Sequence, residues 1–350
     1  MIEILSERAP SESDTTLVTT AKIQELSAEV DLGTTTKRIS VTNIYNPLKV
    51  GSAIFVRPAS SDTSEEFYEI VAVGRSWGLL LLAAFFMLLV LATSGTKGIN
   101  AYVGLVLSFS IIFNFIVPQI LNGANPVTIS LIGSMLILVG TLYVSYGFNK
   151  KSLSALIGIA ITLLLVGLLA HFLVYGLSFM GNVSEETMFL LSAAKNKINL
   201  VGLLIAGIII AAIGVLDDIA ITQAAVVSEF LATDPSLSRT VVFKKAMKLG
   251  RDHISAVINT LVLAYTGASL PLVLLFVVGG TSVSSLLSSE SISEEIVRTL
   301  VATSGLVVAV PITTLIAVFL FKKDAQSGGL TIEQRESSRE GHTHIGHHHG

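Results

Sequence analysis

Residues 200–231 read LVGLLIAGIIIAAIGVLDDIAITQAAVVSEFL, an apolar run that contains two adjacent aspartates, Asp217 and Asp218. About 20 consecutive apolar residues suffice for a helix to cross the hydrocarbon core of a bilayer. Six more such runs occur, at about 77–94, 99–117, 127–147, 153–178, 253–279 and 299–321. The sequence therefore predicts a polytopic α-helical membrane protein with about seven transmembrane helices.

The overall composition agrees with a membrane protein and excludes an ordinary soluble enzyme. Only 13% of the residues are charged and the mean hydropathy is +0.75, whereas soluble domains carry about a quarter charged residues. Residues 1–76 contain eighteen charged side chains and residues 77–231 only ten. The net charge of −3 gives no reason to expect a nucleic-acid partner. The absence of cysteine excludes thiolate chemistry and cysteine-based metal sites, and no cofactor is expected.

The chain is expected to divide into five parts. These are a disordered N-terminus (1–14), a small all-β domain (15–75), the first two transmembrane helices (76–125), a five-helix membrane core (126–322) and a disordered tail (323–350). The β domain contains four short runs rich in Val, Ile, Thr and Tyr, and either binds a partner or serves as a folded spacer. Histidines in the tail form a weak candidate metal site, with a solvated low-complexity segment as the alternative; they are His342, His344, His347, His348 and His349.

Lysine and arginine residues between the spans predict the orientation. One set of alternate loops holds ten of them and the other set three, apart from the β domain and Arg75. Because positive charge favours the cytoplasmic side, we expect a bacterial cytoplasmic membrane protein with its C-terminus in the cytoplasm. The β domain and the acidic loop 289–295 then lie outside. A folded domain in that place must be translocated, either by span 77–94 or by an upstream export helix missing from this chain.

The two aspartates within span 199–228 are the leading candidate site. A carboxylate at that depth costs a few kcal/mol. When the span is placed on a helix, the residues along one of its faces are all small or polar. This stripe comprises Gly207, Ala211, Gly214, Asp218, Thr222, Ala225 and Glu229. Asp218 is therefore expected to face a packed helix interface, with Asp217 nearer the edge of that interface.

The following span supplies a polar face that could satisfy this stripe. Its members recur at helical spacing and are Asp252, Ser255, Asn259, Thr266 and Ser269. Hydrogen bonds between two such stripes can hold helices together in lipid. Secondary candidates are Arg251, His253, Tyr265 and, near Pro311 of the seventh span, Thr313.

Three interpretations of the acidic pair stay open. Asp218 is either a protonated side chain that only specifies helix packing, or a group that takes up and releases protons as its access alternates. The third interpretation, an intramembrane hydrolase that uses Asp218 with Asp252, is disfavoured because the sequence has neither a Gly-x-Ser-x-Gly nor an HExxH motif. The protein is therefore expected not to be an enzyme.

Residues 214–231 and 236–275 resemble the YibE/F family of bacterial membrane proteins. The resemblance is carried by Asp218, by Gly250–Asp252, and by an Asn-Thr-Leu-x-x-Ala-Tyr-x-Gly pattern that begins at Asn259 and ends at Gly267. It covers most of the chain. Members generally begin with an export helix, which agrees with the expectation that an upstream helix is missing from this chain, and membership implies no established activity.

Residues 214–220, Gly-Val-Leu-Asp-Asp-Ile-Ala, are also similar to a helix of the resistance-nodulation-division superfamily, in which an equivalent acidic pair relays protons. The resemblance implies a transporter-like, proton-coupled module of unknown substrate, acting as a homo-oligomer or with a related membrane subunit. The alternative is a non-transporting scaffold or sensor whose β domain binds an extracytoplasmic partner. Membrane lipid is the remaining expected partner.

Overall fold

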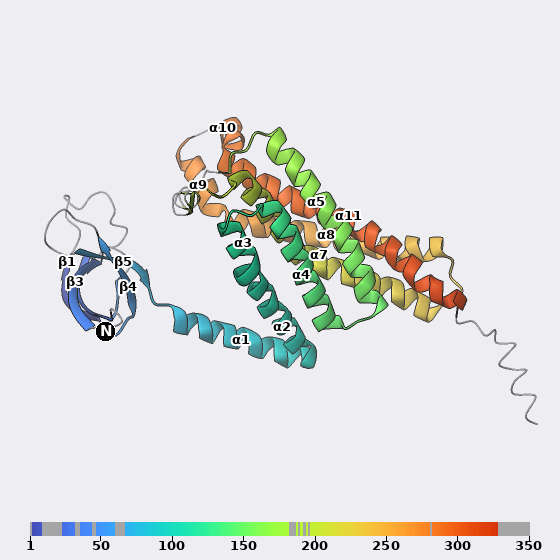
Figure 1. Ribbon diagram of the computed structural model, residues 1–350, viewed down its shortest axis with the longest axis horizontal. Helices are drawn as coiled ribbons and strands as arrows, with labels where there is room; N and C mark the ends of the chain where they lie inside the picture. Colours follow the sequence, from blue (N-terminus) through green and yellow to red (C-terminus); the bar gives the residue numbers. More distant parts are fainter. Residues whose placement is uncertain are drawn as a thin grey trace, which may run out of the picture. The chain divides into compact units, whose positions relative to one another are not determined.

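The computed structural model describes residues 2–8, 23–31, 36–43, 47–59, 67–181, 187, 190–191, 194, 197–280 and 282–327. The chain forms two compact units, Met1–Gly95 and Thr96–Gly350 (Figure 1). Each unit has its own buried core.

The first unit contains five described strands in two antiparallel sheets. One sheet has the order β1 (Ile2–Arg8), β2 (Ile23–Asp31), β3 (Thr36–Asn43), and the other pairs β4 (Ile54–Ala59) with β5 (Phe67–Val73). Alternate residues of each strand point inward, as the period of a half-buried strand requires. The core is formed by Leu26, Ala28, Ile39, Val41, Leu48 and Ile70. An all-β N-terminal region is therefore confirmed.

The expected disorder of residues 1–14 is wrong for its first half. Residues Ile2–Arg8 form β1, which pairs with the outer edge of β2, and Ile4 packs against the core. Strand β2 has backbone hydrogen-bonding groups along both of its edges. Strand β3 pairs with one edge and β1 with the other, so β1 satisfies the groups that the four-strand prediction left without a partner.

Inside the unit, the Gln24 Oε1 atom accepts hydrogen bonds from the Leu48 amide at 2.7 Å and from Asn43 Nδ2 at 3.0 Å.

Helix α1 (Ser76–Ser94) ends the first unit and has apolar side chains on all sides. None of its residues is buried within the chain. A helix that is apolar all round is stable only where an apolar medium or a partner surrounds it. Its length and composition suit a membrane span.

The second unit is entirely helical in its described residues. Its elements are α2 (Thr96–Ile111), the π-helical turn η2 (Ile112–Ile116), α3 (Val117–Leu121), α4 (Pro126–Tyr146), α5 (Lys150–Gly176), α7 (Leu200–Thr233), α8 (Arg239–Ala268), α9 (Leu270–Val278), α10 (Val283–Ser288) and α11 (Glu290–Ser327). Residues Gly98–Leu121 form one long span. Asparagine side chains begin three of the long helices: Asn125 caps α4, Asn149 caps α5 and Asn199 caps α7.

Six helices of the described residues are long and apolar enough to cross a membrane, against seven expected. They begin at Ser76, Gly98, Pro126, Lys150, Leu200 and Glu290. The expected span 253–279 is instead divided at Ser269 into the polar α8 and the short, apolar α9. Pro271 lies in the first turn of α9, and proline both lacks an amide donor and disfavours helix in the residue before it. The tail expected from residue 323 begins later, because α11 continues to Ser327.

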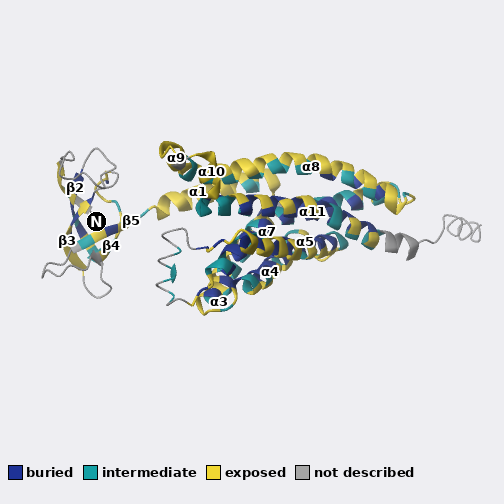
Figure 2. Cartoon of the chain, turned by 90° about the horizontal axis from the view of Figure 1, so that it is seen from above, coloured by how far each residue is buried: buried dark blue, intermediate teal, exposed yellow. Residues whose placement is uncertain are grey.

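Helices α5, α7 and α11 pack against one another and form the centre of the bundle, and α4 covers a further side of α7. Helix α8 packs mainly against α11 and makes few contacts with α7. Figure 2 shows the difference: α7 and α11 are largely buried, whereas α8 is exposed along most of its length. The face of α7 that is turned away from α4, α5 and α11 therefore has little cover from this chain.

Glycines allow the central helices to approach closely. A Cβ atom on Gly158 of α5 would lie 3.1 Å from the Cα atom of Thr313 of α11 and would overlap its hydroxyl group. Gly250 of α8 likewise leaves space for Val310 of α11. Small residues at such contacts are typical of helix association in membranes.

Candidate functional site

The acidic pair lies near the middle of α7, at positions 18 and 19 of its 34 residues. At 1.5 Å per residue the helix is about 50 Å long, which exceeds the thickness of the hydrocarbon core. Both carboxylates are therefore about 25 Å from either end of the helix.

Asp217 is half-buried on the side of α7 that α4 covers. Its carboxylate lies close to the Thr141 side chain of α4. Its Oδ1 atom is buried and has no hydrogen-bond partner among the described residues. An unpaired oxygen in such a place is costly unless a proton or another donor joins it. Tyr146, at the end of α4, lies close enough to interact electrostatically with both aspartates.

Asp218 is exposed in the isolated chain, which corrects the expectation that it faces a packed interface while Asp217 lies at the edge. The physical reason is the placement of α4, which packs on the side of α7 that carries Asp217 and leaves the other side open. A Cβ atom on Gly207 or on Gly214 would meet no atom within 4 Å. The small-residue stripe of α7 is therefore an uncovered face of this chain.

The polar residues of α8 are exposed as well, so the structure does not pair them with the α7 stripe. Asp252, Ser255, Asn259 and Thr266 all lie on the exposed surface. The Ser255 hydroxyl donates to the Arg251 carbonyl at 3.1 Å and the Thr266 hydroxyl to the Val262 carbonyl at 2.7 Å, both within α8. The expected exchange of hydrogen bonds between the two stripes is thus replaced by bonds within one helix.

The secondary candidates occupy separate places. Arg251 is exposed, whereas His253 is partly buried and its Nε2 atom is buried without a described partner. Tyr265 lines a cavity between α8, α9 and α11. Thr313 is fully buried at the contact with Gly158, and its hydroxyl group has no described partner. The tail histidines lie outside the described residues, and within those residues no group of three acidic or histidine side chains could hold a metal ion.

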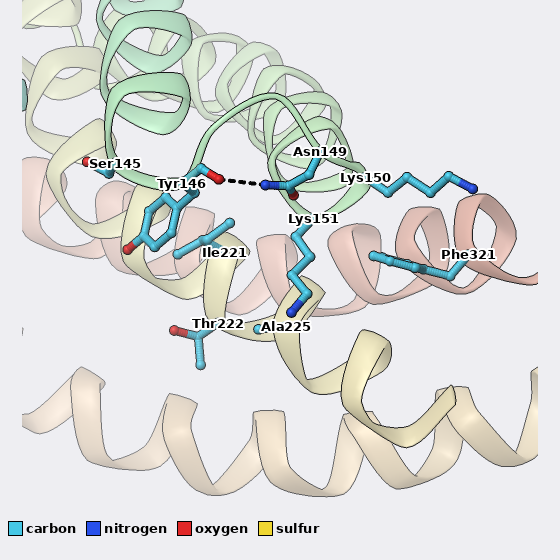
Figure 3. A pocket seen from close by; sticks show the side chains of 9 residues that line it. All are labelled: Ser145, Tyr146, Asn149, Lys150, Lys151, Ile221, Thr222, Ala225 and Phe321. Atoms are coloured by element: carbon cyan, nitrogen blue, oxygen red, sulfur yellow. Dashed lines mark hydrogen bonds between the residues drawn. The ribbon is translucent and has the colours of Figure 1, made fainter. Parts of the chain in front are cut away.

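A cavity of about 760 Å³ opens beside the α7 stripe, and sequence reasoning missed it (Figure 3). Thr222 and Ala225, one and two turns after Asp218, line one wall, and Tyr146 and Lys151 line another. Figure 3 shows the Lys151 side chain extending toward Ala225. The Asn149 side chain, which donates to the Tyr146 carbonyl at 2.6 Å, closes the loop above the cavity. The cavity lies toward one end of the bundle, and its wall begins about one helical turn beyond the aspartates, at Ile221 and Thr222.

Gln223 is the second feature that the sequence analysis missed. It is 4% exposed and joins three helices, because its Nε2 atom donates to the Ala246 carbonyl of α8 at 2.9 Å and to the Thr314 hydroxyl of α11 at 2.7 Å. Gly250 lies directly against its amide group. The available signal was a glutamine within an apolar span, five residues after Asp218.

Replacing Gln223 by Leu is expected to lower the stability of the bundle by about 1–2 kcal/mol, because interhelical hydrogen bonds in membranes contribute about that much. Thermal unfolding in an uncharged detergent measures the change. The matched control is Gln119→Leu, the same substitution at an exposed position of α3. A melting temperature that falls equally in both variants would contradict the role of Gln223.

The long apolar helices pack on one another and also expose apolar side chains on their outer surfaces. These two features define the class of protein: this is a multi-pass membrane protein. The family model described as YibE/F-like protein matches residues 82–323, which is more than half of the chain. The chain therefore belongs to the YibE/F-like family, and the resemblance in its sequence motifs is confirmed. No curated protein and no solved structure matches it, so the similarity to the resistance-nodulation-division superfamily is not shown.

Proposed function

We propose that this protein is a transporter-like, proton-coupled membrane module in which Asp218, together with Asp217, takes up and releases protons. The observation that carries the proposal is an uncovered carboxylate in the middle of a membrane-spanning helix. In hydrocarbon such a group costs at least about 2.5 kcal/mol. Intramembrane acids that are kept at this cost commonly belong to proton or ion pathways.

The same cost implies that the face of α7 around Asp218 does not lie against lipid. We propose that a second copy of this chain covers it, so that the stripe forms the centre of a homodimer. Gly207 and Gly214 leave the surface flat enough for a second helix to approach closely. Two copies related by a two-fold axis would bring the two stripes together, and the exposed polar face of α8 could then pair across the interface.

The cavity beside Thr222 supports a route for water to the acidic pair. It is large enough for several water molecules, and Lys151 and Tyr146 give it polar walls. Lys150 and Lys151 also place positive charge at this end of the bundle, which favours the cytoplasmic side. In this arrangement the β-rich unit is extracytoplasmic, and the membrane is the bacterial cytoplasmic membrane.

Cysteine cross-linking tests the proposed interface, because the chain has no cysteine of its own. A Gly214→Cys variant carries a single thiol on the stripe and is expected to give more than half of the protein as a covalent dimer after mild oxidation in membranes. The reason is that an interface close to the two-fold axis brings the two thiols within bonding distance. Denaturing gel electrophoresis without reductant measures the dimer.

The matched control is Leu164→Cys, which places the thiol on the outer side of α5, where Leu164 is 61% exposed. That variant is expected to stay monomeric on the gel. Equal dimer yields from the two variants would contradict a specific contact through the α7 stripe. Dimerisation through Gly214→Cys together with unchanged proton flux in Asp218→Asn would instead favour the scaffold or sensor interpretation.

A further inference from the structure

Two cavities adjoin at the end of the bundle where α7 and α11 begin, away from the acidic pair. One has a volume of about 480 Å³ and the other of about 310 Å³. Glu295 and Leu272 line both, so the two cavities meet at these side chains. Their combined size lies within the range of small-molecule binding sites. In Figure 1 this end is marked by α9 and α10.

The larger cavity is about half polar, and its described wall carries an excess of negative charge. Arg298 forms an ion pair with Glu295, with Nη1 and Oε2 2.6 Å apart. Glu290 accepts hydrogen bonds from the amides of Met180 and Gly181, at 2.5 and 3.0 Å. Glu294 differs from both, because its Oε1 atom is buried and has no hydrogen-bond partner among the described residues. Glu294 lies within electrostatic reach of Arg298 and of the Glu290 and Glu295 carboxylates, so negative charge exceeds positive charge among the described residues of this cluster.

The smaller cavity is mostly apolar. Aliphatic side chains from α8, α9, α10 and α11 form most of its wall, among them Val262, Leu286, Ile296 and Leu300, and the ring of Tyr265 lies with them. Leu300 is 56% exposed and Ile296 37% exposed. A lining that is mostly apolar with a few charged groups beside it is the usual composition of a small-molecule site.

We propose that the two cavities together bind a hydrophobic organic cation, with its positive group against Glu294 in the larger cavity and its apolar body in the smaller one. Glu295 and Arg298 neutralise each other and separate the two parts. A bulky apolar body also gains from leaving water, by about 25 cal/mol for each Å² buried. Binding of such a cation does not depend on proton movement. That the bound cation is also the transported substrate is a further step, which rests on the proposed transport function.

Tetraphenylphosphonium is a suitable probe, because tetraphenylborate has nearly the same shape and the opposite charge. Equilibrium dialysis with the full-length protein in an uncharged detergent measures both. We expect the wild-type protein to bind the phosphonium, Glu294→Gln to bind it at least tenfold more weakly, and tetraphenylborate to compete poorly. Glu229→Gln, which removes an exposed carboxylate near the far end of α7, is the matched control and is expected to bind like the wild type.

A second variant keeps the test independent of folding at Glu294. Ile296→Arg adds positive charge to the wall of the apolar cavity and is expected to weaken phosphonium binding by a similar factor, with an unchanged elution volume in size exclusion. Binding of the phosphonium with wild-type affinity by both variants, or equal binding of tetraphenylborate by the wild type, would overturn the proposal. Asp218→Asn is expected to bind the phosphonium normally, so the failure of proton coupling and the failure of this site can be told apart.

Discussion

A Gly158→Val variant is expected to lose most of its folded protein, with a stability lower by about 3 kcal/mol or more. A Cβ atom at this position would lie 3.1 Å from the Cα atom of Thr313 and overlap the hydroxyl group of the same residue. The nearest atoms thus include backbone, which cannot rotate away, and α5 would have to move from α11. Overpacking of a tight core costs about 1–3 kcal/mol even where side chains can adjust, and this contact is in the centre of the bundle.

Fluorescence-detected size exclusion over a temperature series measures the loss. Gly78→Val is the matched control, because a Cβ atom at Gly78 of α1 would meet nothing within 4 Å. It introduces the same β-branched residue into an apolar helix and is expected to leave the melting temperature within a few degrees of wild type. A Gly158→Val protein that is as stable as the Gly78→Val protein would contradict the described contact between α5 and α11.

Hydropathy predicted most of the helical unit correctly, because the length of an apolar run is a strong constraint in a bilayer. Six of the seven expected spans correspond to long apolar helices of the structure. The seventh differs because its apolar run crosses a helix break at Ser269, so that neither the part in α8 nor the short α9 is long enough by itself to span a membrane. Strand β1 was missed for a different reason: its pairing with β2 is a long-range contact that local composition does not show.

The site was predicted in part. Helical spacing correctly places the Asp218 stripe and Asp217 on different faces of α7, because adjacent residues of a helix with 3.6 residues per turn lie about 100° apart. Which face is covered depends on where α4 and α8 pack, and the spacing of residues along α7 does not show that. The acidic run 289–295 was assigned to a loop, whereas Glu290 begins α11 and Glu294 and Glu295 line a cavity. Charge density alone does not distinguish a loop from the first turns of a helix.

Proton flux through reconstituted protein is expected to fall more than tenfold when Asp218 is replaced by Asn. The amide is nearly the same size as the carboxylate, so packing on the α7 face changes little, but it cannot bind and release a proton near neutral pH. Asp217 remains in the variant, but its carboxylate lies on the side of α7 that α4 covers, and not on the open face that carries Asp218. The loss should therefore not be restored by its neighbour.

Two observations separate this effect from a general loss of folded protein. Asp218→Asn is expected to unfold at the wild-type temperature, because the Asp218 side chain is exposed within the chain. Glu229→Gln, which neutralises another exposed carboxylate of the same stripe, is expected to keep wild-type flux. A strong loss of stability in Asp218→Asn would instead support a purely structural role for the acid.

The most direct measurement is the acidification of vesicles that contain the wild-type protein, Asp218→Asn or Glu229→Gln at equal density, after a step to lower external pH. A pH-sensitive dye inside the vesicles records the rate. The proposed function predicts fast acidification with the wild type and Glu229→Gln, and a rate close to that of protein-free vesicles with Asp218→Asn. Equal, fast acidification by all three proteins would contradict it.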